Sequence, residues 1–351
     1  MPRAWIDILT PKQILFFKPL KDKLESYGFD VLATSRKYRE LEPIARMQGM
    51  DLVYVGERGG ATKADQLAAA TSRQAAITPR IKRFAPQVSV SVASGVCARV
   101  SFGLGIKHVA VNDSPHSEVA GRLSLPLSYH LFCPWVIPYD AWAKFGIARS
   151  KITRYHALDP AAWLKRKARR GPIPRLNRKR RTVVVRLEES YAPYMAGTKR
   201  SWNDVVLRSI SDSVAGVNLV ALCRYGDQLR HVRKEFGDRF TVPEEAVDGR
   251  SLLRVTDVFV GMGGTMTAES ALMGVPTISA FQGSLYTEDY LVSVGLVRKT
   301  TSPKRLVQLV GDSLEHPDRS GHSRKARRIL GSMEDPTARI AKFLADSARQ
   351  A

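Results

Sequence analysis

The chain has 351 residues, a length that suits two domains of ordinary size. Hydrophobic residues make up 44% and charged residues 25%, as in soluble globular proteins, and the absence of any run of 18 apolar residues excludes a membrane-spanning helix. The formal net charge of +22 is unusual, and it indicates an anionic partner such as nucleotide phosphates, acidic lipid or nucleic acid.

The first half of the chain alternates between strand and helix patterns. Strands are expected at residues 5–9, 30–34, 51–55, 88–93 and 108–112, with helices at 14–27, 41–49, 64–84 and from 94–95 to about 103–105. This βαβα alternation predicts a parallel sheet with helices on both faces.

Prolines and a basic run interrupt the alternation at about residues 158–181, after which it restarts. Strands are expected at residues 182–187, 217–223, 258–260 and 277–280, with helices at 202–213, 227–236, 268–273, 291–295, 304–313 and 323–344. We therefore expect an N-terminal domain at 1–160, a basic linker at 161–181 and a C-terminal domain at 182–351. Open α/β sheets bind ligands beyond the carboxyl ends of their strands, so a crevice between two such domains is the expected site.

The segment 258–279 is the most informative in the chain, because it reads as strand, glycine turn, helix and strand. Gly261, Gly263 and Gly264 allow a tight turn and a close approach of the backbone to a ligand. Thr265 or Thr267 is expected to cap the following helix. A glycine turn that leads into a helix N-terminus directs free N–H groups and the positive dipole end at one point, which is a natural phosphate site.

Glu269 lies one turn into that helix, where its carboxylate could accept hydrogen bonds from ribose hydroxyls. The segment is neither the dinucleotide fingerprint G-x-G-x-x-G nor a P-loop. The alternative reading is a close-packed strand–helix turn with no ligand.

Loops after strands in the first half hold further candidates. Ser94 and Gly95 open a second glycine-assisted helix start that is expected to face the crevice. Asp113, His116 and Glu118 follow a predicted strand within six residues, and they are groups of general acid–base chemistry. The alternative is that Asp113 caps a helix while the other two side chains are solvated.

Arginines end two strands of the second half. Arg186 and Arg224 would face the crevice and could clamp a phosphate, although a pair with a neighbouring glutamate is an equal alternative. Tyr191, Tyr194 and Trp202 could stack on a base or a sugar, with core packing favoured for Trp202.

Residues 165–181 contain ten basic residues and no acid, and the rest of the chain still carries +12. Gly171, Pro172 and Pro174 break any helical spacing, which predicts an irregular connection. A solvated linker and adhesion to an anionic membrane or to RNA are the alternatives.

The three cysteines, Cys97, Cys133 and Cys223, are far apart in apolar surroundings. This pattern predicts reduced, buried thiols in a cytoplasmic protein rather than a disulfide frame or a metal site. The N-terminus begins a strand and lacks the apolar region of a signal peptide. We expect no cofactor and no metal ion, and the sequence leaves the oligomeric state open.

Several segments resemble one family over nearly the whole chain. The opening W-I-D-I-L-T-P with F-F-K-P-L, Val185-Arg186, the glycine turn through Met266, and Glu269 with A-L-M-G-V-P are similar to domain-of-unknown-function family 354. This largely archaeal group belongs to the GT-B glycosyltransferase superfamily. The resemblance implies two Rossmann-like domains that face each other across a crevice.

A more distant similarity extends to UDP-N-acetylglucosamine 2-epimerases and to the lipid-linked N-acetylglucosaminyltransferases of the murein pathway. In those enzymes the Gly-Gly turn holds the UDP diphosphate and the helix glutamate holds the ribose. The resemblance assigns these roles to Gly263, Gly264, Thr265 and Glu269. The loop at 112–118 departs from the acidic pattern of the epimerases. Family 354 usually has a His/Gly-Ser-Pro segment near the fourth strand, and this chain has Ser94-Gly-Val there instead.

Three functions are consistent with these patterns. The first is a metal-independent glycosyltransferase with a UDP-sugar donor, expected to be a UDP-N-acetylhexosamine. This enzyme would work in the cytoplasm or at the inner face of the membrane, on a lipid-linked acceptor. The second is a UDP-sugar epimerase or hydrolase, favoured by the acidic loop. The third is a nucleic-acid-binding or RNA-modifying protein, favoured by the net charge.

Overall fold

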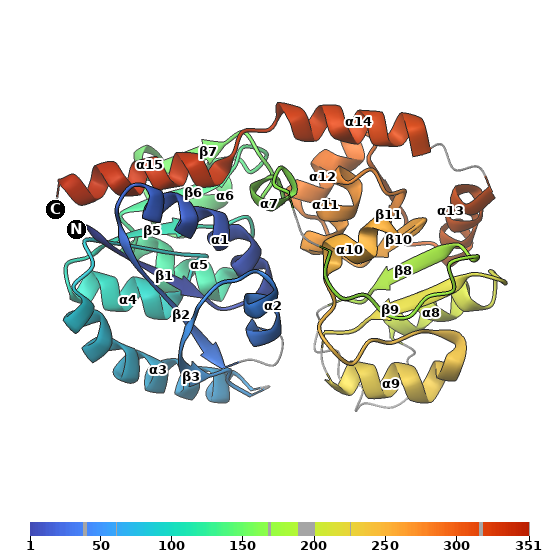
Figure 1. The fold of residues 1–351 in the computed structure, drawn as a ribbon, viewed down its shortest axis with the longest axis horizontal. Coiled ribbons are helices and arrows are strands. Elements are labelled where there is room, and N and C mark those ends of the chain that lie inside the picture. The colour runs from blue at the N-terminus through green and yellow to red at the C-terminus, as the bar shows by residue number, and fades with distance from the viewer. Residues whose placement is uncertain are drawn as a thin grey trace. The chain divides into compact units, whose positions relative to one another are not determined.

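The computed structural model describes residues 1–37, 41–60, 62–167, 170–188, 201–224, 226–315 and 319–350. The chain forms two compact units (Figure 1). Unit 1 comprises Met1–Arg166 and Met333–Ala351, and unit 2 comprises Lys167–Ser332. Each unit is a parallel sheet with helices, so the α/β fold class predicted from the alternation of patterns is confirmed.

Unit 1 is built on a seven-stranded sheet with the order β3-β2-β1-β4-β5-β6-β7. Its strands are β1 (Arg3–Ile8), β2 (Asp30–Lys37), β3 (Val53–Glu57), β4 (Val88–Ser91), β5 (Lys107–Val111), β6 (His130–Pro134) and β7 (Ile152–Tyr155). Its helices are α1 (Pro11–Ser26), α2 (Leu41–Met47), α3 (Lys63–Phe84), α4 (Gly95–Gly103), α5 (Glu118–Ser124), α6 (Asp140–Ala143), α7 (Ala161–Leu164) and α15 (Pro336–Arg349). The chain adds strands on one side of β1 and then crosses to the other side, so the strand order reverses between β1 and β4.

The core of unit 1 explains why β1 is central. Trp5 is fully buried and packs with Ile77 and Ile81 of α3. Cys97 and Val100 of α4 belong to the same cluster. A strand buried on both faces is expected to be almost continuously apolar, as residues 4–6 are.

The C-terminal helix packs on unit 1, against α1 and α7 (Figure 1). The sequence analysis placed all of residues 182–351 in one domain. It also predicted a single helix at 323–344, and this prediction is wrong because the segment forms the two helices α14 (Arg319–Ser332) and α15. Asp335 has extended backbone angles and caps α15, whose first residue is Pro336. Proline disfavours a helical conformation in the residue before it and lacks the N–H that would continue a helix, so the chain breaks here.

Unit 2 is built on a five-stranded sheet with the order β12-β11-β10-β8-β9. Its strands are β8 (Thr182–Arg186), β9 (Asn218–Leu222), β10 (Val258–Gly261), β11 (Thr277–Ser279) and β12 (Val297–Lys299). Its helices are α8 (Trp202–Ser211), α9 (Gly226–Phe236), α10 (Gly249–Arg254), α11 (Thr265–Leu272), α12 (Tyr286–Ser293), α13 (Pro303–Glu315) and α14 (Arg319–Ser332). Val183 and Val185 of β8 pack into the core on one face of the sheet, and Val184 packs on the other. The strand order reverses between β8 and β10.

The basic run at 165–181 connects the two units and is anchored at both ends. The Lys165 ammonium donates to the Met333 carbonyl, and Arg166 pairs with Asp335 at 2.7 Å. Arg181 pairs with Asp257 at 3.2 Å. The described residues 170–181 contain neither helix nor strand, as predicted, and attachment of their exposed charges to an anionic surface stays a prediction. Within the described ranges, no helix combines the length and the apolar character needed to cross a membrane.

The three cysteines are free thiols, with Cys97 and Cys133 buried and Cys223 half-buried. Burial raises the pKa of Cys133 to about 12 and that of Cys223 to about 11. These thiols are therefore protonated at neutral pH, as in unreactive structural cysteines.

The buried His108 of β5 makes the stability of unit 1 depend on pH. Its Nε2 lies 2.9 Å from Ser91 Oγ and its Nδ1 lies 3.0 Å from Ser128 Oγ. Burial lowers its pKa from 6.5 to about 4, against a smaller opposing effect of Asp7. At pH values between about 4 and 6.5, His108 is therefore protonated in the unfolded chain and neutral in the folded chain.

We predict that the free energy of unfolding falls by about 3 kcal/mol because of His108 as the pH drops from about 6.5 to about 4. A His108→Gln variant keeps hydrogen-bonding groups but lacks this titration. Urea unfolding at several pH values should show a shallower slope over this window for the variant. Equal slopes for the two proteins would contradict the assignment.

Candidate functional site

The glycine turn of unit 2 lies where the strand order reverses. Gly261 ends β10 and is paired in register with Arg186, which ends β8. The Met262 N–H donates to the Arg186 carbonyl at 3.1 Å. Ligands of open α/β sheets bind at such reversal points, beyond the carboxyl ends of the strands. The structure therefore places the sequence's strongest motif at the position where a ligand is expected.

Two glycines shape the turn. Gly263 and Gly264 have φ angles of +84° and +83°, a region that residues with a side chain rarely adopt. A Cβ atom on Gly263 would lie 3.1 Å from the Phe281 ring, whereas one on Gly264 would meet no protein atom within 4 Å. The backbone at Gly264 is thus open to a close approach from outside.

Helix α11 begins directly after this turn, with Gly264 as its N-cap residue. The prediction that Thr265 or Thr267 caps the helix is wrong, because the Thr267 hydroxyl instead donates to the Gly263 carbonyl at 3.3 Å. A glycine N-cap has no side chain to accept hydrogen bonds from the first N–H groups of the helix. These N–H groups and the positive dipole end therefore suit an anion.

Glu269 lies on α11 and is only 7% exposed, so the carboxylate predicted to bind ribose is largely buried. Its charge acts on Arg250 of α10. Burial and Arg254 lower the pKa of Arg250, while Asp248 and Glu269 act in the opposite direction. Glu269 thus belongs to a half-buried group of charges beside the helix start.

The two arginines predicted from strand ends lie on neighbouring strands. Arg186 donates to the carbonyl oxygens of Leu222 and Cys223, at 3.4 Å each, and so reaches the end of β9. Arg224 follows that strand, and its N–H donates to Gln228 Oε1 at 2.9 Å. The structure therefore places Arg186, Arg224 and the glycine turn on the same edge of one sheet.

The structure describes only one of the three aromatic candidates. Tyr191 and Tyr194 lie outside the described residues. The Trp202 indole donates to the Ala280 carbonyl at 2.7 Å and packs against the core, so Trp202 is a structural residue.

Phe281, Glu288 and Lys299 were missed by the sequence analysis and lie beside the turn. The Lys299 ammonium lies 5.6 Å from the centre of the Phe281 ring. It also pairs with the buried Glu288 at 2.6 Å. No short motif signals this arrangement, because it joins residues from β12, α12 and the loop after β11.

In unit 1 the reversal point is occupied by buried charges. Asp7 of β1 and Arg73 of α3 form an ion pair at 2.6 Å. Ser94, at the start of α4, donates to Asp7 Oδ2 at 2.8 Å and accepts from the Cys97 N–H at 3.2 Å. The Ser94 hydroxyl is thus used internally. A Cβ atom on Gly95 would lie 3.1 Å from Leu123, which accounts for the glycine by packing.

The three acid–base candidates of the loop after β5 are not brought together. His116 and Glu118 are exposed, and Glu118 pairs with Arg122 one helical turn away at 2.8 Å. Asp113 instead pairs with Lys12 at 2.5 Å. The solvated alternative therefore holds for His116 and Glu118, and only Asp113 stays a candidate.

Lys12 holds a second carboxylate that the sequence analysis missed. Its ammonium lies 2.7 Å from Asp159 Oδ2, and Asp159 Oδ1 accepts from the Tyr155 hydroxyl at 2.5 Å. Burial would raise the pKa of Asp113, but the Lys12 charge and hydrogen bond lower it below its ordinary value. Burial raises the pKa of Asp159 despite the same lysine. The two carboxylates therefore differ in basicity although they share one cation.

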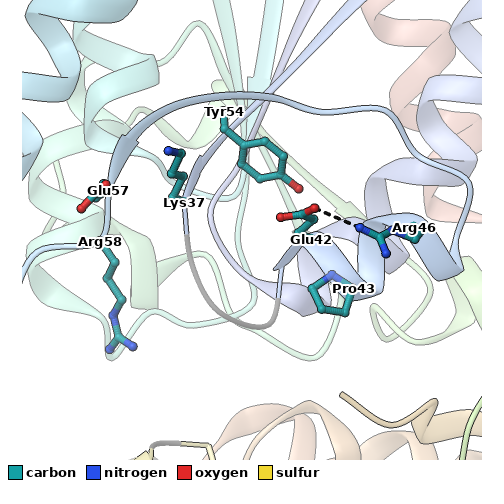
Figure 2. Close-up of a pocket in the computed structure, with 7 residues that line it drawn as sticks. All are labelled: Lys37, Glu42, Pro43, Arg46, Tyr54, Glu57 and Arg58. Atoms are coloured by element: carbon teal, nitrogen blue, oxygen red, sulfur yellow. Dashed lines mark hydrogen bonds and ion pairs between the residues drawn. The ribbon is translucent and has the colours of Figure 1, made fainter. Parts of the chain in front are cut away.

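An open hollow of about 600 Å³ lies elsewhere on the carboxyl edge of unit 1, at the ends of β2 and β3. Figure 2 shows the Tyr54 ring turned toward Glu42, which pairs with Arg46 at 3.0 Å. The hollow is lined by Lys37, Glu42, Pro43, Arg46, Tyr54, Glu57 and Arg58. Small-molecule sites are mostly apolar, so this charged lining does not suit a nucleotide base.

The sequence pattern of a family described as "Protein of unknown function (DUF354)" matches residues 3–347. The chain belongs to this family. An uncharacterized protein of Methanocaldococcus jannaschii is 28% identical over 328 residues, which cover 89% of this chain and 91% of that protein. The family resemblance read from the sequence is therefore confirmed.

Solved structures with the same architecture include nucleotide-sugar enzymes. S. aureus MnaA, in a structure with UDP, has a TM-score of 0.76 at 11% identity and covers 100% of this chain and 98% of its own. The Neisseria meningitidis UDP-GlcNAc 2-epimerase, bound to UDP-GlcNAc, has a TM-score of 0.64 at 11% identity and covers 99% of this chain and 100% of its own. The spinosyn forosaminyltransferase SpnP has a TM-score of 0.62 at 16% identity, with 98% and 99% covered. At these identities the likeness shows the fold, which is the GT-B fold.

The buried Asp7–Arg73 pair gives a stability prediction for unit 1. Arg73→Met should lower the free energy of unfolding by about 3–5 kcal/mol, because it leaves a buried carboxylate without its cation. The double variant Asp7→Asn/Arg73→Met removes both charges and should recover much of this loss. Urea unfolding at pH 7 measures both. A single variant within about 1 kcal/mol of the parent would show that the pair is not needed.

Proposed function

We propose that this protein is a GT-B enzyme that binds a nucleotide sugar, and that it transfers the sugar of a UDP-N-acetylhexosamine to an acceptor without a metal ion. The observation that carries the proposal is the open glycine turn at the reversal point of the unit 2 sheet. Gly264 offers close backbone approach, and α11 begins directly after it with no side-chain cap hydrogen bond from its N-cap residue.

The chemistry of this edge fits a diphosphate leaving group. Negative charge develops on the diphosphate as the bond to the sugar breaks, and preorganised donors stabilise such charge most effectively. The N–H groups at the start of α11 would bind the diphosphate oxygens, and Arg186 and Arg224 add positive charge on the adjacent strands. The sequence contains no Asp-x-Asp motif for a divalent ion, which motivates the metal-independent form of the proposal.

The similarity to structures with UDP and with UDP-GlcNAc supports uridine nucleotides as the first ligands to test. Calorimetry with UDP, ADP and GDP, each with and without EDTA, tests the proposal directly. We expect UDP to bind more tightly than the other two and EDTA to leave its affinity unchanged. Lack of binding by every nucleotide diphosphate and nucleotide sugar would refute it.

A second candidate is epimerisation or hydrolysis of the same donor, favoured by the likeness to the Neisseria meningitidis UDP-GlcNAc 2-epimerase. Proton NMR of UDP-N-acetylglucosamine incubated without an acceptor separates the activities. Signals of the 2-epimer indicate epimerisation, and free sugar indicates hydrolysis. An unchanged spectrum from a protein that binds UDP is the result expected for a transferase.

The backbone donors can be tested by a proline at the first helical position. Thr265→Pro removes one N–H that has no partner within the helix, and proline is well tolerated there. UDP affinity should fall by about ten- to a hundredfold, the equivalent of one charged hydrogen bond. Thr265→Ala keeps the N–H and serves as the control. Equal UDP affinities for the two variants would show that the Thr265 N–H does not bind UDP.

The ribose role of Glu269 gives a different signature. Glu269→Gln should weaken UDP binding by about 1–3 kcal/mol, because a charged acceptor is lost. Uridine, which lacks phosphate, should lose the same amount, whereas Thr265→Pro should leave uridine binding almost unchanged. Calorimetry with both ligands checks this. A Glu269→Gln loss confined to UDP would place the glutamate at the phosphates rather than the ribose.

A further inference from the structure

The Lys12 cluster, defined as Lys12, Asp113, Asp159 and Tyr155, belongs to unit 1 and was given no role in the function proposed above. It joins the start of α1 to the loop after β5 and to the end of β7. Asp159 is 3% exposed, whereas Asp113 and Lys12 are each 19% exposed. One carboxylate of the cluster is therefore sealed in the unit and the other reaches solvent.

Asp113 is held firmly without being saturated. Its Oδ2 accepts from Lys12 and its Oδ1 accepts from the Ser114 hydroxyl at 2.9 Å. A carboxylate has about four lone-pair sites, so it can accept further hydrogen bonds from a ligand. The Asn112 side chain also fixes this turn, by accepting from the Ser114 N–H at 2.8 Å. The exposed edge of Asp113 is thus an oriented hydrogen-bond acceptor.

The groups of the cluster set one another's protonation state. Two carboxylates share one ammonium, and the Tyr155 hydroxyl binds the buried member as a neutral donor. Burial would lower the pKa of Lys12, but the two carboxylates raise it, so the lysine stays charged. Burial, Asp159 and Asp113 raise the pKa of Tyr155, so it stays neutral, as does the neighbouring Cys133 thiol. The Lys12 charge therefore lowers the pKa of Asp113, the carboxylate that reaches solvent, and keeps it ionised at neutral pH.

We propose that Lys12 and Asp159 are positioning residues that hold Asp113 as an ionised carboxylate facing a hydroxyl-bearing acceptor. This inference rests on the proposed transfer of a sugar from a UDP-sugar. In that reaction the acceptor oxygen forms a bond to the anomeric carbon while the bond from that carbon to the diphosphate oxygen breaks. The bonding electrons leave with UDP, and the acceptor's hydroxyl proton passes to Asp113.

The electrostatic part is tested by carbon-13 NMR of the full-length protein labelled at the aspartate carboxyl carbons. Comparison with Asp113→Asn assigns the signal. In Lys12→Met the pKa of Asp113 should rise by more than about one unit, because two carboxylates then repel each other without a cation. In Lys12→Met/Asp159→Asn the pKa should fall again, because the repelling carboxylate is gone. Lys12→Arg keeps the charge and should keep the low value.

The surface pair of Lys18 and Asp22, 2.6 Å apart on the same helix, provides the matched control. Lys18→Met should leave the Asp113 titration unchanged. If the Asp113 signal titrates alike in the parent and in Lys12→Met, or if the second substitution fails to reverse the shift, the positioning role is wrong. The double variant removes the lysine together with the carboxylate that repels Asp113, so it gives a second measurement of the Asp113 titration if Lys12→Met alone folds poorly.

The catalytic part is tested by UDP release from UDP-N-acetylglucosamine across pH, with a high concentration of glycerol as the hydroxyl-bearing acceptor. The rate should decline at low pH as Asp113 takes up a proton, and Lys12→Met should move this decline upward by the same shift that NMR records. A decline that stays in place while the NMR value moves would overturn the role as base. A parent protein that binds no nucleotide would instead refute the proposed function, and the NMR comparison would still decide the positioning role.

Discussion

A parallel sheet delivers the carboxyl end of every strand to one edge, and the chain can leave space at that edge only where the strand order reverses. In unit 2 the reversal falls between β8 and β10, so the loops after these strands run away from each other. The glycine turn and the start of α11 lie there because β10 ends there. Arg186 lies beside them because it is the register partner of Gly261. The candidate nucleotide site is therefore a consequence of topology as much as of motif.

Unit 1 uses its own reversal point differently. The edge between β1 and β4 is filled by the ion pair of Asp7 and Arg73, which is sealed by hydroxyl groups from Ser94 and from Thr34, whose Oγ1 donates to Asp7 at 2.8 Å. A buried pair costs desolvation and is retained only where its geometry satisfies both charges. The polar groups that reach solvent lie further along the sheet, at β5, in Asp113. One sheet thus presents the start of a helix at its edge, and the other presents a partly exposed carboxylate.

The parts that the sequence predicted are those encoded within a few residues. The strand, turn and helix at 258–272 follow from local glycine placement and β-branched residues, and the structure has them in register. The failures have a common physical cause. Thr265 looked like a cap because its residue type favours caps, yet the glycine before it satisfied the backbone geometry. The helix at 323–344 looked continuous because apolar spacing outweighed one proline.

Long-range pairing could not be read from the sequence. Lys12 lies between the strand expected at 5–9 and the helix expected at 14–27, and Asp159 lies in the stretch where the alternation is interrupted, so nothing local predicted that they meet. Asp113, His116 and Glu118 seemed a cluster because they are close in sequence. The turn after β5 directs Asp113 inward while the start of α5 leaves Glu118 with Arg122 in solvent. Proximity along the chain is a weak guide where a strand ends and a helix begins.

The central claim is that the edge of the unit 2 sheet at Gly264 receives the diphosphate of a nucleotide. A crystal structure of the protein with UDP tests it most directly. The account predicts diphosphate oxygens within hydrogen-bond distance, about 2.7–3.2 Å, of the N–H groups that begin α11, with a ribose hydroxyl at Glu269. UDP bound in the hollow at Tyr54, or at the start of any other helix, would contradict it.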